Sequence, residues 1–185
     1  ILVEYTKKFF SKGFIEYCKG YMADEKKDYE TAFKYYSSAA DLGHPTAQYA
    51  LGILYNNGEG VVKDHKKALE YTMKAMAILE CVLPSEHPSL ASSFNNLAAT
   101  YGALGDHQKA LEYHLKSMSI FENALPPDHP DLATAYNNVG YTYGELGQYP
   151  QALEYIKKAL SIFEKSLPAE HPHIKSTRKA VMMYQ

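Results

Sequence analysis

Three His-Pro pairs recur at a fixed spacing of 42 residues, and imidazole is a common metal ligand and proton carrier. They are His87-Pro88, His129-Pro130 and His171-Pro172, each 42 residues after the last. Packed helices lie about 10 Å apart, whereas zinc ligands lie about 2 Å from the metal. Histidines at equivalent places in a repeat therefore cannot share one ion. We expect them to cap helices or contact linkers, and we predict no metal site.

Other motifs with catalytic or cofactor-binding chemistry are missing from the sequence. The remaining histidines show no HExxH or His-x3-His spacing. No Gly-Lys-Ser/Thr follows the Gly58-Glu59-Gly60 loop and no strand precedes it, so it does not predict a phosphate site. No motif surrounds a Ser/His/Asp or Cys/His set. We therefore expect a protein that is not an enzyme and binds no cofactor.

Two Asn-Asn pairs carry the most informative polar chemistry. Asn95-Asn96 and Asn137-Asn138 stand in the middle of segments that otherwise indicate apolar helices. An asparagine amide offers two donors and an acceptor without charge. It can hydrogen-bond the backbone of an extended peptide whatever the peptide's side chains are. The pairs therefore predict a peptide-binding surface.

An internal duplication supplies the elements that position these pairs. When residues 84–125 are aligned with 126–167, 22 of the 42 paired residues are identical. Each period predicts two helices. Pro88 and Pro130 suit a first helical turn, and Gly105 and Gly147 suit a helix end. Asp106 is a suitable N-cap for the second helix.

The duplicated pattern resembles a known repeat family. Ala91, Leu97-Ala98, Tyr101 and Ala110 resemble a tetratricopeptide repeat, and the Leu-Pro-x-x-His-Pro linker is similar to the long repeats of kinesin light chain. The loop at residues 58–61 and the longer spacing from Gly52 to Ala68 resemble a Sel1-like repeat. The resemblance implies an all-α, right-handed superhelical solenoid of antiparallel helix pairs. We expect one solenoid over residues 1–185, with a capping helix at 1–12, Sel1-like repeats at 13–83, two 42-residue repeats at 84–167 and a C-terminal capping helix at 168–185.

Helical geometry puts the Asn pairs opposite the packing face. With about 100° per residue, Leu132, Val139 and Tyr143 share one apolar stripe, and Asn137 and Asn138 fall on the other side. In the proteins that this chain resembles, the non-packing stripe of the first helices lines a concave groove that binds peptides. The predicted peptide-binding residues are Ser92, Asn95, Asn96, Thr134, Asn137, Asn138 and Tyr141, with Thr46, Tyr49 and Asn56 extending the stripe upstream.

Two roles remain open for the asparagines. They can bind a ligand, or they can hydrogen-bond a neighbouring repeat and serve the architecture alone. The function that the resemblance implies is a non-catalytic scaffold that holds a peptide or protein segment in a groove. The alternatives are a structural spacer or self-association module, with a homodimer through the terminal helices, and a regulatory domain of a larger protein.

Composition narrows the partners and the compartment. The net charge of −2 and the pI of about 6.5 argue against a nucleic-acid surface. No apolar run approaches the ~18 residues of a membrane span. Cys18 and Cys81 stand 63 residues apart without a CxxC partner, which favours free thiols in a reducing compartment. We expect a cytoplasmic protein with a protein or peptide partner.

Overall fold

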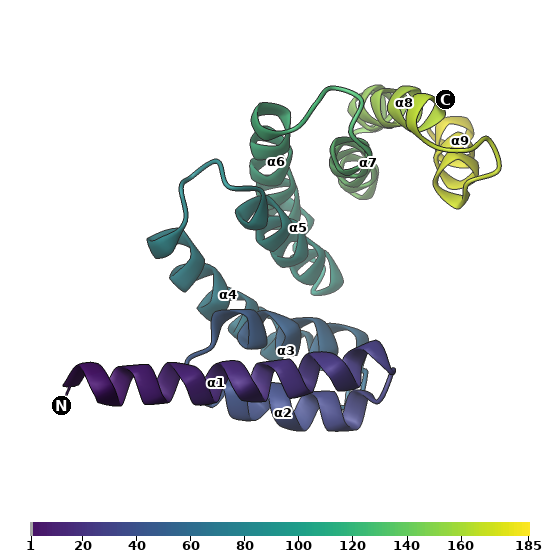
Figure 1. The fold of residues 1–185 in the computed structure, drawn as a ribbon. Helices are drawn as coiled ribbons and strands as arrows, with labels where there is room; N and C mark the ends of the chain where they lie inside the picture. Colours follow the sequence, from purple (N-terminus) through teal and green to yellow (C-terminus); the bar gives the residue numbers. More distant parts are fainter. Residues whose placement is uncertain (1) are drawn as a thin grey trace. The chain divides into compact units, whose positions relative to one another are not determined.

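The computed structural model describes residues 2–185, with side chains from residue 12 onward. Over this range the chain forms nine α-helices and no strand, and the helices pack as two compact units divided between Val82 and Leu83 (Figure 1). Unit 1 contains α1 (Leu2–Glu25), α2 (Tyr29–Asp41), α3 (Pro45–Asn57) and α4 (His65–Val82). Unit 2 contains α5 (Pro88–Ala103), α6 (His107–Ala124), α7 (Pro130–Glu145), α8 (Tyr149–Ser166) and α9 (Pro172–Tyr184).

Histidine and aspartate side chains begin many of these helices. The Nδ1 atoms of His87, His129 and His171 each accept a hydrogen bond from the backbone N–H two residues later. Proline follows each of them in the first helical turn, where its missing N–H costs nothing. Helix α3 begins in a similar way at His44, and Asp106 caps α6. The cap roles predicted for the recurring histidines and for Asp106 are confirmed.

The recurring Leu-Glu-Tyr motif holds the two helices of a pair together. Its tyrosine stacks on a tyrosine of the preceding first helix, with ring centroids 5.5–5.7 Å apart. Its glutamate pairs with a lysine four residues later, and such exposed pairs contribute a few tenths of a kcal/mol each. The stacked pairs are Tyr55–Tyr71, Tyr101–Tyr113 and Tyr143–Tyr155.

Unit 1 closes around large side chains that fit against alanines. Tyr36, Leu51 and Leu54 are almost fully buried beside small residues of α2 and α3. The loop after α3 approaches the start of α2 closely. Gly60 has a φ of 66°, and a side chain there would collide with the carbonyl of Tyr29. Gly60 of the Gly-x-Gly-Val sequence is therefore required by this close backbone approach.

The two repeats of unit 2 pack their helix pairs with different residues at one buried position. In α7, a Cβ atom at Gly140 would lie 2.7 Å from Cγ1 of Ile156 in α8. The equivalent positions 42 residues earlier hold Ala98 and His114. Isoleucine carries two heavy atoms on Cβ and histidine carries one, so histidine leaves room for the alanine methyl. Among the described residues the Nδ1 atom of His114 has no hydrogen-bond partner, and burial lowers the pKa of this ring to about 4.

The all-α fold of helix pairs agrees with the sequence prediction. Helix α1 runs without interruption through the boundary that we expected between residues 12 and 13. The side chains of the expected capping segment at residues 1–11 lie outside the described part of the chain. The division of the sequence into repeats stays a prediction.

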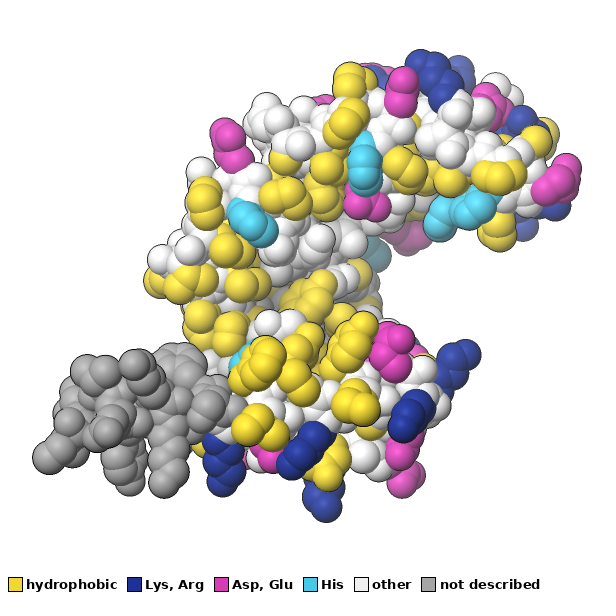
Figure 2. Space-filling view, in the orientation of Figure 1, with side chains coloured by type: hydrophobic (Ala, Val, Ile, Leu, Met, Phe, Trp, Pro, Cys, Tyr) yellow, Lys and Arg dark blue, Asp and Glu magenta, His cyan; other side chains and the backbone are white. Residues whose placement is uncertain are grey.

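An apolar stripe follows the outer side of α1. Phe14, Ile15, Tyr21 and Met22 are 50–61% exposed, and their spacing puts them on one side of the helix together with Cys18. Figure 2 shows hydrophobic side chains gathered on the visible face of unit 1, to which α1 belongs. Helix α1 is thus apolar on two sides, since its inner side packs against α2.

Candidate functional site

The Asn pairs lie on neighbouring first helices of unit 2 and connect them. Asn138 Nδ2 donates to Asn95 Oδ1 at 2.7 Å, which joins α7 to α5. Thr177 Oγ1 of α9 donates to Asn137 Oδ1 at 3.3 Å, which joins α9 to α7. The first helices of unit 2 are therefore linked side by side through the predicted stripe. The asparagines therefore form the hydrogen bonds to neighbouring repeats that were one of the two roles left open by the sequence.

These bonds do not exhaust the amides. An asparagine side chain has two N–H donors and an oxygen with two lone pairs, and each inter-repeat bond uses one of these. The Asn95 amide keeps its N–H groups, and Asn138 keeps its oxygen. Asn96 is half-buried, and its side chain has no hydrogen-bond partner among the described residues. One polar row can thus hold the helices together and still offer groups to a ligand.

A hollow of about 240 Å³ lies between α5 and α7. This volume is below the roughly 300–1,000 Å³ of small-molecule sites, so it suits a side chain or a short stretch of peptide. Four of the predicted residues line it, namely Ser92, Asn95, Asn96 and Thr134. Phe121 of α6, Asp131 and Ala135 complete the lining.

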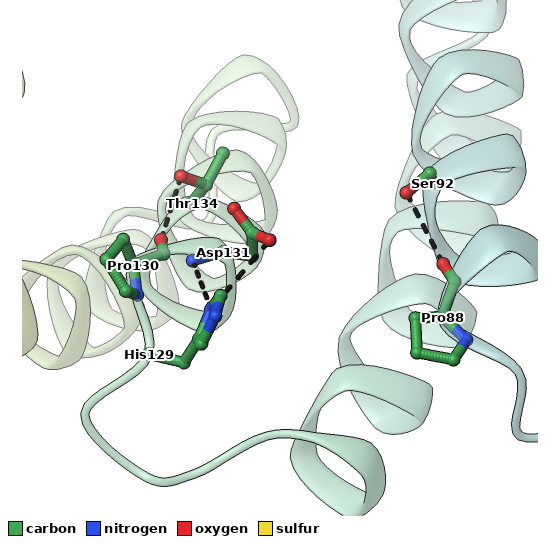
Figure 3. A network of polar contacts seen from close by, with 6 residues as sticks. All are labelled: Pro88, Ser92, His129, Pro130, Asp131 and Thr134. Carbon is green, nitrogen blue, oxygen red and sulfur yellow. Dashed lines mark hydrogen bonds and ion pairs between the residues drawn. The ribbon is translucent and has the colours of Figure 1, made fainter.

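The hydroxyl groups at the hollow point their hydrogens away from it. Ser92 Oγ donates to the carbonyl of Pro88 at 3.3 Å, and Thr134 Oγ1 donates to the carbonyl of Pro130 at 3.0 Å. Figure 3 shows both bonds, on facing helices. Because each hydroxyl hydrogen is already used within its own helix, each oxygen presents lone pairs to an incoming group.

Asp131 supplies the one charge among the lining residues. Its backbone N–H is donated to His129 Nδ1, and that same nitrogen lies 3.8 Å from its carboxylate (Figure 3). A nitrogen that accepts this hydrogen bond carries no proton and so gives the carboxylate no cationic partner. Within the described part of the chain, no lysine or arginine pairs with Asp131. The carboxylate side chain is 65% exposed and gives the hollow a negative charge.

Two further predicted residues of α7 are turned toward α9. Asn137 accepts the hydrogen bond from Thr177, and the ring of Tyr141 meets that of Tyr184 edge-on, with centroids 6.5 Å apart. Burial raises the pKa of Tyr141. These two residues do not line the hollow, although they belong to the same stripe.

The predicted residues of α3 belong to unit 1. Thr46 is exposed, and burial raises the pKa of Tyr49 to about 12. Asn56 Oδ1 lies 2.9 Å from His65 Nδ1, so its amide links the end of α3 to the start of α4. Neither Tyr49 nor Asn56 lines the hollow of unit 2, and their predicted binding role stays a prediction.

Sequence reasoning missed Phe121, Asp131 and Ala135. A signal for Asp131 was available, because it precedes Thr134 by three residues and Asn138 by seven, which places it on the same side of the helix. Phe121 comes from α6, the second helix of its pair. Its Ile-Phe-Glu context does not distinguish a residue that lines a hollow from an ordinary core residue.

Among the described residues, no group of three or more His, Cys, Asp or Glu side chains is placed to hold a metal ion. No helix in the described range is long and apolar enough to cross a membrane.

Comparison with known proteins adds the family. Residues 53–123 and 89–165 match the family model of the tetratricopeptide repeat, and residues 13–44 match that of the Sel1 repeat. No curated protein sequence shows a significant match. None of the matching family models indicates an enzyme.

Solved structures show the same fold at low sequence identity. A Podosopora anserina kinesin-light-chain-like protein with nearly identical TPR-like repeats is 22% identical, with a TM-score of 0.74 over 95% of this chain and 86% of that one. BtubC (BKLC) from P. vanneervenii is 20% identical, with a TM-score of 0.76 over 89% and 68%. The apo form of RapI is 21% identical, with a TM-score of 0.78 over 93% and 62%. These similarities establish the helix-pair repeat fold.

Proposed function

The chain belongs to the tetratricopeptide repeat family, whose members are generally protein–protein interaction scaffolds, and we propose that the α5–α7 face of unit 2 binds an extended segment of a partner protein. The α5–α7 face is the set of residues that line the hollow together with Asn138. The role is non-catalytic. Because Cys18 and Cys81 are free thiols, we propose a reducing compartment such as the cytoplasm.

One observation carries this proposal. The hollow is lined by amides and hydroxyls that keep unused hydrogen-bonding groups, and the Asn95–Asn138 bond already fixes two of the amides in place. A surface that is ordered before binding loses little conformational entropy when a ligand arrives. Peptide backbone alternates donors and acceptors, as asparagine side chains do, so the chemistry suits an extended segment.

The experiment is a random-peptide display screen on the full chain, followed by titration of the recovered peptides. Asn96→Ala removes an amide with no partner in the described residues, and Thr134→Val removes a lining hydroxyl at nearly constant shape. A lost hydrogen bond in a bound state costs on the order of 1 kcal/mol, so we expect each variant to bind about fivefold more weakly.

Asn123→Ala is the matched control, because Asn123 is an exposed asparagine of α6 that does not line the hollow. Its affinity for the peptides should equal that of the wild type. Peptides whose binding is unchanged by Asn96→Ala and Thr134→Val would refute the proposed face, as would a screen that recovers no peptide.

Self-association is a second candidate function, and the apolar stripe of α1 favours it. Phe14, Ile15 and Met22 would lose exposed apolar surface if the stripes of two copies packed together. Sedimentation of the full chain at rising concentration tests this candidate. A dimer that Met22→Glu abolishes would support it, and a monomer at all concentrations would reject it.

A further inference from the structure

Three of the residues that line the hollow between α5 and α7 present oxygen acceptors, beside the amide N–H groups of Asn95 and Asn96. The oxygens of Ser92 and Thr134 have their hydrogens committed to helix carbonyls, and Asp131 contributes two carboxylate oxygens. These groups come from two facing helices and converge on one small volume (Figure 3). A ligand group that satisfies them must carry several donors.

The charge of the lining adds a second requirement for the ligand group. The single ionised group of the lining is the Asp131 carboxylate, and the nearest imidazole nitrogen, His129 Nδ1, faces it with a lone pair. The other aspartate of this turn, Asp128, lies outside the lining and pairs with Lys165 at 3.3 Å. Asp131 thus leaves an uncompensated negative charge at the hollow, and a cation would neutralise it.

The apolar part of the lining and the volume of the hollow indicate which cationic side chain fits. Phe121 is nearly buried and offers an apolar surface at the base, against which a methylene stem can lie. About 240 Å³ accommodates one long side chain. Guanidinium carries five N–H donors in a planar fork, whereas ammonium carries three, and the fork can bind a carboxylate through two parallel bonds.

We propose that the hollow between α5 and α7 is the subsite for an arginine side chain of the bound segment, with Asp131 as its ion-pair partner. Ser92 and Thr134 accept the remaining guanidinium hydrogens, and the aliphatic stem lies on Phe121. This assignment rests on the proposed function of the α5–α7 face and names the chemistry of its partner: an extended segment with an arginine.

The test uses the full chain and two capped amino acids as probes. N-acetyl-arginine amide carries the guanidinium, and N-acetyl-citrulline amide is its neutral counterpart of nearly the same shape. Binding is followed by ¹H–¹⁵N spectra, in which the side-chain amides of Asn95 and Asn96 and the backbone amide of Asp131 report on the hollow. The arginine probe should shift these signals, and the citrulline probe should bind at least tenfold more weakly, because its neutral group forms no ion pair with the Asp131 carboxylate.

Two variants with the same charge change separate the subsite from a general field effect. Asp131→Asn should weaken binding of the arginine probe about tenfold or more, while the backbone signals outside the hollow keep their positions. Asp128→Asn should leave its affinity within twofold of the wild type. Equal binding of the two probes, or equal affinity of Asp131→Asn and wild type, would overturn the assignment.

Peptide selection distinguishes failure of the arginine subsite from failure of the proposed function. If display-selected peptides bind the α5–α7 face but contain no arginine, the function stands and the arginine subsite is wrong. If selected peptides carry an arginine whose replacement by citrulline costs tenfold in affinity for wild type and nothing for Asp131→Asn, both are supported.

Discussion

The buried His114 of α6 should make the protein lose stability on mild acidification. Burial lowers its pKa to about 4 from an ordinary value of 6.5, because the protonated ring would lose its hydration. In the unfolded chain the ring takes up a proton as the pH falls through 6.5, whereas in the folded chain it does so only near pH 4. The stabilising effect of the neutral ring is therefore complete above pH 6.5 and is lost as the pH falls toward 4.

The size of the effect follows from the two pKa values. Between pH 6.5 and 4.5, the ring binds a proton in the unfolded chain but stays largely neutral in the folded chain. Over these roughly two pH units, each unit lowers the free energy of unfolding by about 1.36 kcal/mol. We expect His114 alone to reduce the free energy of unfolding by about 2.5 kcal/mol between pH 7.5 and 4.5.

His114→Leu removes the titration and keeps a single heavy atom on Cβ, so it avoids the clash that isoleucine would make beside Ala98. Urea unfolding followed by circular dichroism, at pH 7.5 and 4.5, gives the loss of stability for each protein. The other titrating groups are common to both proteins and cancel in the comparison. The wild type should lose about 2.5 kcal/mol more than His114→Leu over this range. Equal losses, or a His114 ring that titrates near pH 6.5 by NMR, would refute the reasoning.

Three further predictions concern stability and are checked by urea unfolding at pH 7.5. Asn138→Ala should lower the free energy of unfolding by about 1 kcal/mol, because it leaves Asn95 without its partner. Asn96→Ala should change it by less than about 0.5 kcal/mol. Equal losses in the two variants would contradict the inter-repeat hydrogen bond. Gly140→Ala should destabilise by about 1–2 kcal/mol because its methyl meets Ile156, whereas Gly102→Ala, whose nearest neighbour is 3.9 Å away, should stabilise by about 1 kcal/mol; a gain in both would refute the tight packing. Gln148→Asp should stabilise by about 1 kcal/mol, since Gln148 caps α8 with no side-chain bond while Asp106 at the equivalent place caps α6; no gain would show that the cap is already satisfied.

Much of the fold could be predicted because its signals are local and repeated. The His-Pro starts, the Asp106 cap and the glycines after α5 and α7 act within a few residues of themselves, so their sequence context determines their conformation. The angular positions of Asn95 and Asn138 followed from helix geometry alone. Repetition made each signal visible more than once.

The rest depends on contacts between helices, which the sequence leaves open. Nothing local indicates that Asn138 bonds Asn95 of the previous repeat, or that Asn137 meets Thr177. The lining of the hollow includes Phe121 of α6, and a stripe drawn on the first helices alone leaves out a residue of a second helix. Asp131 shared that stripe, but its place at a helix start offered a sufficient reason for an acidic residue.

The most direct test of the central claim, that the α5–α7 face binds a partner segment, is the location of a display-selected peptide on the isotope-labelled full chain. In ¹H–¹⁵N spectra recorded during titration, we predict the largest shifts at the side-chain amides of Asn95 and Asn96 and the backbone amides of residues 130–135. Largest shifts along the apolar stripe of α1 at residues 14–22, or on α6 and α8 away from the hollow, would contradict the claim.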